Sequence, residues 1–199
     1  MNPVRLVLQT VFQPRLRIRS IGSSGWLVES FTALTILLLI GFSSHISSSL
    51  IYGNRPSFFG IGIGMAGSFA LGLIGLGFLI SIAHTMMGFA GRSGSVLVFL
   101  FASVVSFSPF VLEGIGSSLI VCLLQPYFGI SIVEMARIVW FLLLIVDSLA
   151  LLVYSLNVVY GKMSSAQALT VPCSVAFVLI LIITLTPLGL VLKIMGGLA

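Results

Sequence analysis

Charged side chains are scarce in this sequence. Only 7% of its 199 residues are charged and 59% are hydrophobic, whereas an ordinary soluble domain carries about 25% charged residues. So few charges cannot cover a surface that faces water, so we expect lipid to solvate the outside of the molecule. The length allows one domain, and the apolar segments leave no room for a separate soluble one.

Groups that carry chemistry are equally few. The chain has four acidic residues, two histidines and two cysteines. The predicted topology puts Cys122 and Cys173 near opposite membrane faces, too far apart for a disulfide, which needs Cα atoms within about 7 Å. There is no Cys–His metal spacing, His-Glu-x-x-His motif, phosphate-cradling loop or Gly-x-Ser-x-Gly elbow. We therefore predict no enzymatic activity, no metal and no cofactor.

Long apolar runs fill most of the chain. About 20 residues span the hydrocarbon core of a bilayer as a helix, and five runs reach that length: 31–51, 58–87, 96–124, 138–160 and 168–192. The connections between them are short, which favours antiparallel neighbours, and Pro109, Pro172 and Pro187 are expected kink sites. The sequence predicts an all-α membrane protein whose residues 26–199 form a bundle of about five transmembrane helices.

Residues 1–25 form the only extended polar region. Residues 3–13 predict a short amphipathic helix that lies on the membrane and ends before Pro14. The arginines of this region are the candidates for contact with anionic lipid: Arg5, Arg15, Arg17 and Arg19. Such clustered charge beside a span predicts a cytoplasmic N-terminus and an outside C-terminus in the cell (inner) membrane. The charges are too few and too close to the membrane to indicate nucleic-acid binding.

Four ionisable residues lie in or near the predicted spans: His45, His84, Glu113 and Asp147. A charge inside a membrane is costly and is a functional candidate by default. One interpretation is an ion or proton path through Glu113, Asp147 and His45. The other is structural, with Glu113 paired to Arg137 and Asp147 protonated or hydrogen-bonded. The half of the bundle nearer the cytoplasm offers few further polar groups, which favours the structural interpretation.

The second predicted span is rich in glycine. Its small residues at four-residue spacing could form a helix-packing or partner face: Gly60, Gly64, Ser68 and Gly72. Small side chains let a neighbouring backbone approach closely, which is how helices associate in lipid. Both packing within the bundle and association with a second copy or another membrane protein fit this pattern.

Three stretches resemble the Yip (Ypt-interacting protein) family of integral membrane proteins, in particular its short prokaryotic members. The matching stretches are Phe12-Gln13-Pro14-Arg15 before the first span, Ala90-Gly91-Arg92-Ser93-Gly94-Ser95 with Ser108-Pro109, and Tyr160-Gly161 with Ala166 and Ala168. The resemblance covers most of the chain and implies a non-enzymatic membrane adaptor with five spans. Eukaryotic members associate with prenylated Rab-type GTPases in vesicle traffic. This sequence departs from them by lacking a long cytosolic N-terminal region, which speaks against GTPase binding.

The sequence therefore predicts a membrane scaffold or adaptor that acts through lipids, other membrane proteins or self-association. Two alternatives stay open. A small transporter, channel or lipid-translocating component would use Glu113 and Asp147. An accessory subunit of a larger membrane complex would co-purify with the chains of that complex.

Overall fold

The protein is all-helical over the part that the computed structural model describes, residues 3–23, 25–52 and 58–162. The elements in chain order are α1 (Pro3–Phe12), α2 (Pro14–Ser20), α3 (Trp26–Tyr52), α4 (Phe58–Phe89), α5 (Val96–Ser106), the 3-10 turn η1 (Ser108–Leu112), α6 (Glu113–Leu124) and α7 (Ile130–Tyr160). The all-α prediction is therefore confirmed.

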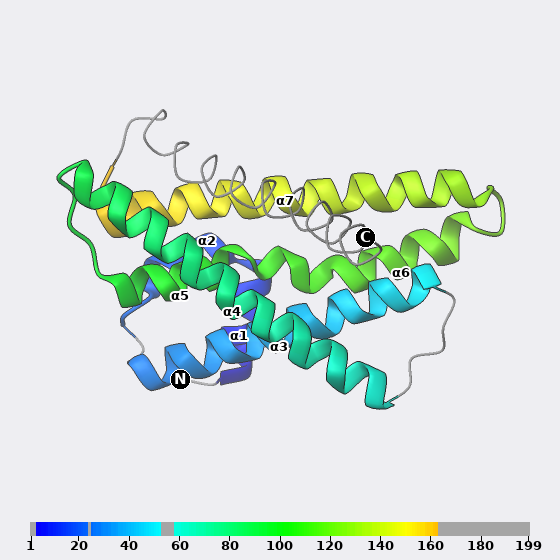
Figure 1. The fold of residues 1–199 in the computed structure, drawn as a ribbon, viewed down its shortest axis with the longest axis horizontal. Helices are drawn as coiled ribbons and strands as arrows, with labels where there is room; N and C mark the ends of the chain where they lie inside the picture. The colour runs from blue at the N-terminus through cyan, green and yellow to red at the C-terminus, as the bar shows by residue number, and fades with distance from the viewer. Residues whose placement is uncertain (1–2, 24, 53–57, 163–199) are drawn as a thin grey trace, which may run out of the picture.

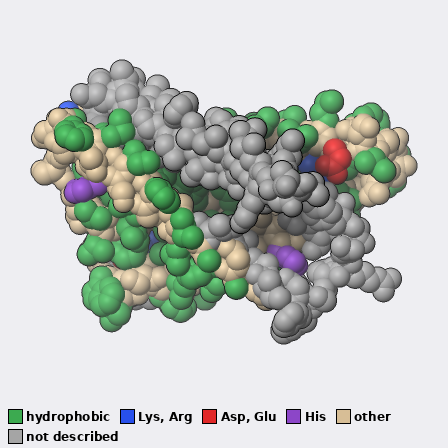
Figure 2. Space-filling view, viewed as in Figure 1, with side chains coloured by type: hydrophobic (Ala, Val, Ile, Leu, Met, Phe, Trp, Pro, Cys, Tyr) green, Lys and Arg blue, Asp and Glu red, His purple; other side chains and the backbone are tan. Residues whose placement is uncertain are grey.

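Four segments within the described residues are long and apolar enough to cross a membrane: Trp26–Ile46, Gly72–Phe89, Val96–Leu124 and Ile130–Tyr160. They correspond to the first four predicted spans. The fifth predicted span, 168–192, lies outside the described residues. Only 22% to 44% of each segment is buried inside the protein, so most of their apolar surface faces outward. Figure 2 shows many hydrophobic side chains on the visible face, as expected for a protein that lipid surrounds.

The start of the fourth span was predicted wrongly. The predicted spans 96–124 and 138–160 left residues 125–137 as a connection, but α7 already begins at Ile130, just after Gly129. Arg137 donates a hydrogen bond to Glu134 at 3.1 Å, three residues earlier on the same helix. Side chains at this spacing are neighbours on a helix surface. The two charges are therefore compatible with a helix that continues past the apolar run.

The third span is broken near its middle. Pro109 has no N–H to donate and cannot continue a regular helix. The chain therefore passes through η1 between α5 and α6, both of which pack on α7. Figure 1 shows α5 and α6 following each other alongside α7, with α3 below them in this view and α4 crossing in front. The predicted kink at Pro109 is confirmed, while Pro172 and Pro187 lie outside the described residues.

The core lies where α3, α4, α5 and α7 meet. Its members are fully or almost fully buried apolar residues, among them Ile36, Leu79, Phe99, Leu152 and Leu156. A second cluster contains Ile18 from α2, and residues of α1 pack against the first. The N-terminal segment therefore belongs to the folded bundle.

Candidate functional site

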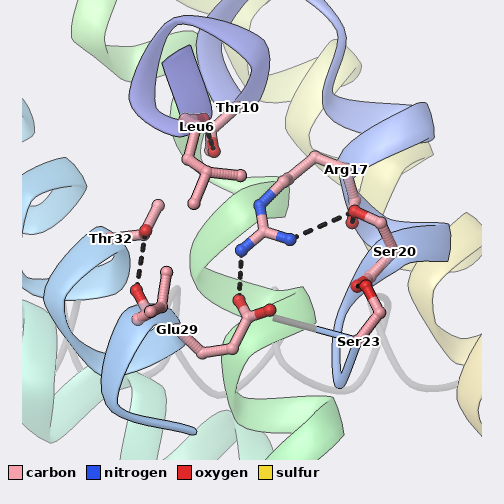
Figure 3. Close-up of polar contacts among 8 residues, drawn as sticks. Leu6, Thr10, Arg17, Ser20, Ser23, Glu29 and Thr32 are labelled. Atoms are coloured by element: carbon pink, nitrogen blue, oxygen red, sulfur yellow. Dashed lines mark hydrogen bonds and ion pairs between the residues drawn. The ribbon is translucent and has the colours of Figure 1, made fainter. Parts of the chain in front are cut away.

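The strongest polar feature of the described residues is a buried ion pair between the N-terminal segment and the first span. The Arg17 guanidinium on α2 donates through Nη2 to Oε2 of Glu29, which lies in the first turn of α3. The exposed fractions are 0% for Arg17 and 3% for Glu29. Figure 3 shows the two side chains pointing toward each other beneath α1. The pair therefore joins two helices inside the protein and is hidden from solvent.

The local sequence explains why these two charges meet. Pro14 starts α2, where its missing N–H costs nothing. Gly22 and Gly25 have positive φ values of 92° and 79° and turn the chain from α2 into α3. Glu29 then lies near the N-terminus of α3, where the helix dipole favours a negative charge. Arg17 also donates through Nη1 to Ser20 Oγ at 3.1 Å, which fixes its head group.

The pair is not fully satisfied. Arg17 Nε and Glu29 Oε1 are buried and have no hydrogen-bond partner among the described residues. Burying an ion pair removes both charges from water, and imperfect hydrogen bonding leaves part of that cost uncompensated. The pair therefore fixes where the N-terminal segment lies more than it stabilises the bundle.

Helices α1 and α2 are separated only by Gln13, and the two together, hereafter called the N-terminal hairpin, pack into the bundle. Thr10 is fully buried, and its carbonyl accepts a hydrogen bond from Ser108 Oγ at 2.9 Å, at the break of the third span. On α2, Arg19 donates to the Tyr154 hydroxyl and lies 5.6 Å from the centre of its ring. Figure 1 shows the hairpin beside the half of the bundle where α3 and α5 begin and α7 ends.

The predicted helix over residues 3–13 is confirmed as α1, which ends at Phe12. Its predicted position on the membrane surface stays a prediction, and its inner face packs on α3 and η1. Leu6 is completely buried there. The sequence pattern shows that one face of a helix is apolar, but not whether lipid or protein covers that face.

The outer face of α1 carries an apolar stripe and a polar stripe side by side. Val4, Leu8 and Phe12 form the apolar stripe and are 64%, 52% and 69% exposed. The polar stripe consists of Arg5, Gln9 and Gln13. Both stripes border a hollow of about 530 Å³ lined by Arg5, Leu8, Gln9, Phe12 and Gln13. The hairpin therefore presents a defined amphipathic surface outside the bundle.

The four predicted lipid-contact arginines divide into two groups. Arg5, Arg15 and Arg19 lie at the exposed surface of the hairpin. Arg17 does not, because its side chain is fully buried against Glu29. The prediction of a lipid contact for Arg17 is therefore wrong. The sequence offers one signal for the correct partner, an acidic residue twelve positions later at the start of the first span.

The four predicted intramembrane residues do not gather in one place. Ser43 Oγ accepts from the Gly114 N–H at 2.6 Å, so the α3 turn near His45 lies beside the α6 turn that contains Glu113. Glu113 and His45 are half-buried, and Asp147 is exposed on α7. His84 Nδ1 lies 3.1 Å from the Tyr160 hydroxyl. The two histidines thus belong to different neighbourhoods, and the pairing of Glu113 with Arg137 stays a prediction.

Close helix contacts occur at glycines of the third span. A Cβ atom on Gly114 would lie 2.6 Å from the Ser43 backbone oxygen, and one on Gly116 would overlap the Trp140 ring. Gly72 belongs to the predicted packing face of the second span. A Cβ atom on it would meet only the end of the Leu37 side chain, at 3.9 Å. The side chains of Gly60, Gly64 and Ser68 are outside the described set. The sequence did not predict Gly114 and Gly116 as contact residues. These two glycines lie two residues apart, whereas the predicted packing face of the second span has a spacing of four residues.

Comparison with protein-family models, with curated proteins and with solved structures gives no match. The structure itself defines the class: a helical polytopic membrane protein with four candidate spans among its described residues. Its resemblance to the Yip family stays a prediction from the sequence.

Proposed function

We propose that this chain is a non-enzymatic membrane scaffold or adaptor of the Yip type, acting through contacts with lipids and other membrane proteins at its N-terminal hairpin. The observation that supports this most is the buried pair of Arg17 and Glu29. It holds a basic segment against the bundle in one position. A contact surface that is fixed before binding loses less conformational entropy when a partner arrives.

The polar groups inside the bundle also favour a scaffold over a transporter. The hydroxyls of Ser106 and Ser155 lie 2.7 Å apart, and each also lies within hydrogen-bond distance of a carbonyl one turn earlier on its own helix. Because each hydroxyl has one proton, one serine donates to the other and the second donates to its own carbonyl. Ser103 bonds the Phe99 carbonyl in the same way. Such bonds join membrane helices without opening a path. In this proposal the N-terminus is cytoplasmic, and Glu113 and Asp147 have no transport role.

The experiment is purification of the full chain in a gentle detergent, with quantitative identification of the proteins that accompany it. Phe12→Glu places a charge on the outer face of the hairpin, and Phe89→Glu places the same charge on an exposed Phe at the end of α4. We expect both variants to stay monodisperse. We expect only Phe12→Glu to lose the accompanying proteins.

The transport alternative predicts a different outcome. If Phe12→Glu keeps every accompanying protein, while Glu113→Gln or Asp147→Asn changes ion or substrate flux in proteoliposomes, the scaffold proposal fails and a transport role replaces it. The accessory-subunit alternative predicts that all variants keep one fixed stoichiometric set of larger chains.

A further inference from the structure

The depth of α1 in the bundle makes its polar stripe unusual. The Thr10 carbonyl is bonded to Ser108, which lies well inside the candidate span that starts at Val96. At a rise of 1.5 Å per residue, Ser108 lies about 18 Å from that end of the span. On the outer face of the same helix, Arg5 and Gln13 are exposed and Gln9 is half-buried, and a lipid tail beside them would offer no hydrogen-bond partner.

The described residues supply no counterion for the positive charge of Arg5. Glu29 is the first acidic residue of the sequence, and it is already paired with Arg17. Glu134 is paired with Arg137 on α7. No described residue bonds the Arg5 side chain, which is exposed beside the hollow.

The shape of the hollow indicates what can fill it. Arginine presents several N–H donors in a fixed plane that matches a phosphate group, and the bonds are charge-assisted. The Gln9 and Gln13 amides lie one and two turns further along the same face and add neutral donors. Leu8 and Phe12 border the same hollow with apolar surface. A single ligand that matches this lining therefore has an anionic group and a hydrocarbon part side by side.

We infer that this hollow binds one anionic phospholipid, with its phosphate against Arg5, Gln9 and Gln13 and an acyl chain along Leu8 and Phe12. The bound lipid neutralises the charge of Arg5 and satisfies its hydrogen-bond donors. This lipid site rests on the proposed function in one respect, because both require the hairpin to lie at the membrane. It does not depend on any protein partner.

The test is a lipid titration of the full chain in non-ionic detergent, with bound lipids counted by native mass spectrometry. We expect dioleoyl-phosphatidylglycerol to bind more tightly than dioleoyl-phosphatidylcholine. Arg5→Gln removes the charge-assisted bonds and should weaken phosphatidylglycerol binding about tenfold or more. Arg92→Gln removes an arginine from the turn between α4 and α5, outside the hollow, and should leave binding unchanged. Arg5→Lys should restore part of the affinity.

Three results would overturn the site. The first is equal affinity for the two lipids, and the second is equal loss in Arg5→Gln and Arg92→Gln. The third is displacement of phosphatidylglycerol by an equal concentration of inorganic phosphate, because the apolar border would then contribute nothing. If Arg5→Gln keeps full lipid affinity but loses accompanying proteins, the hollow belongs to an acidic protein partner. Equal affinity of the unmodified chain for the two lipids, with all accompanying proteins retained, rejects this site and leaves the scaffold proposal intact.

Discussion

Neutralising Glu29 should release the N-terminal hairpin from the bundle. The carboxylate and the Arg17 guanidinium are 3% and 0% exposed, so water screens their attraction very little. Removing one partner of a buried pair typically costs about 3–5 kcal/mol, because the other charge stays buried without compensation. Glu29→Gln keeps one oxygen as an acceptor, so we expect about 3 kcal/mol, the lower end of that range. At about 1.4 kcal/mol per factor of ten, the released population should rise more than a hundredfold.

Limited trypsin digestion reports this release directly. Trypsin cleaves after arginine, and the hairpin contains Arg15, Arg17 and Arg19 within α2. Cleavage in a helix requires local opening, and its rate follows the open population when closing is faster than cutting. Cleavage in the hairpin of purified Glu29→Gln protein should therefore accelerate in proportion to that population.

A matched control uses the other described ion pair. Glu134 also pairs with an arginine, but it is 44% exposed and lies on the same helix as its partner. Such pairs contribute about 0–1 kcal/mol, so Glu134→Gln should leave hairpin cleavage unchanged. The double variant Arg17→Met with Glu29→Leu removes both charges and the two unpaired buried atoms, and should recover most of the lost stability. Equal cleavage rates in Glu29→Gln and Glu134→Gln would refute the reasoning.

Two further substitutions test the packing and the polar residues. Gly114→Ala should lower the unfolding free energy in detergent by about 1–3 kcal/mol, because the added methyl meets the Ser43 backbone; Gly75→Ala meets no described atom within 4 Å and is the control. An equal thermal stability for the two alanine variants would contradict the close contact. Asp147→Asn should change stability by less than about 0.5 kcal/mol, because the amide keeps the size and the acceptor oxygen of the side chain. A large loss in thermal melting would show that this carboxylate is structurally engaged.

Local patterns predicted the features of this fold that depend on local chemistry. Apolar runs located the first four spans, since a helix must be long and apolar to cross a bilayer. Proline located the end of α1 before Pro14 and the break of the third span at Pro109, because it cannot donate a backbone hydrogen bond. The start of α7 escaped prediction because Glu134 and Arg137 satisfy each other within a helix.

The candidate site was much harder to predict, since it depends on contacts between distant segments. Ser108 bonds the carbonyl of Thr10 across 98 positions, and no local pattern encodes that contact. The amphipathic stripe of α1 predicted a helix but not its environment, because a lipid tail and a protein interior are almost equally apolar. Sequence reasoning could therefore identify the basic segment as important while placing Arg17 at the wrong surface.

The buried pair also explains why the hairpin adopts one position. Apolar contacts are non-directional, so the inner face of α1 could pack against several apolar helix surfaces with similar energy. A buried Arg17 that is not beside Glu29 would be an uncompensated charge, which is strongly unfavourable. Alternative placements of the hairpin are therefore destabilised even though the native pair, with two unpaired atoms, contributes little net stability. This predicts that the charge-free double variant keeps its melting temperature but shows several hairpin positions by cysteine cross-linking between α2 and α7.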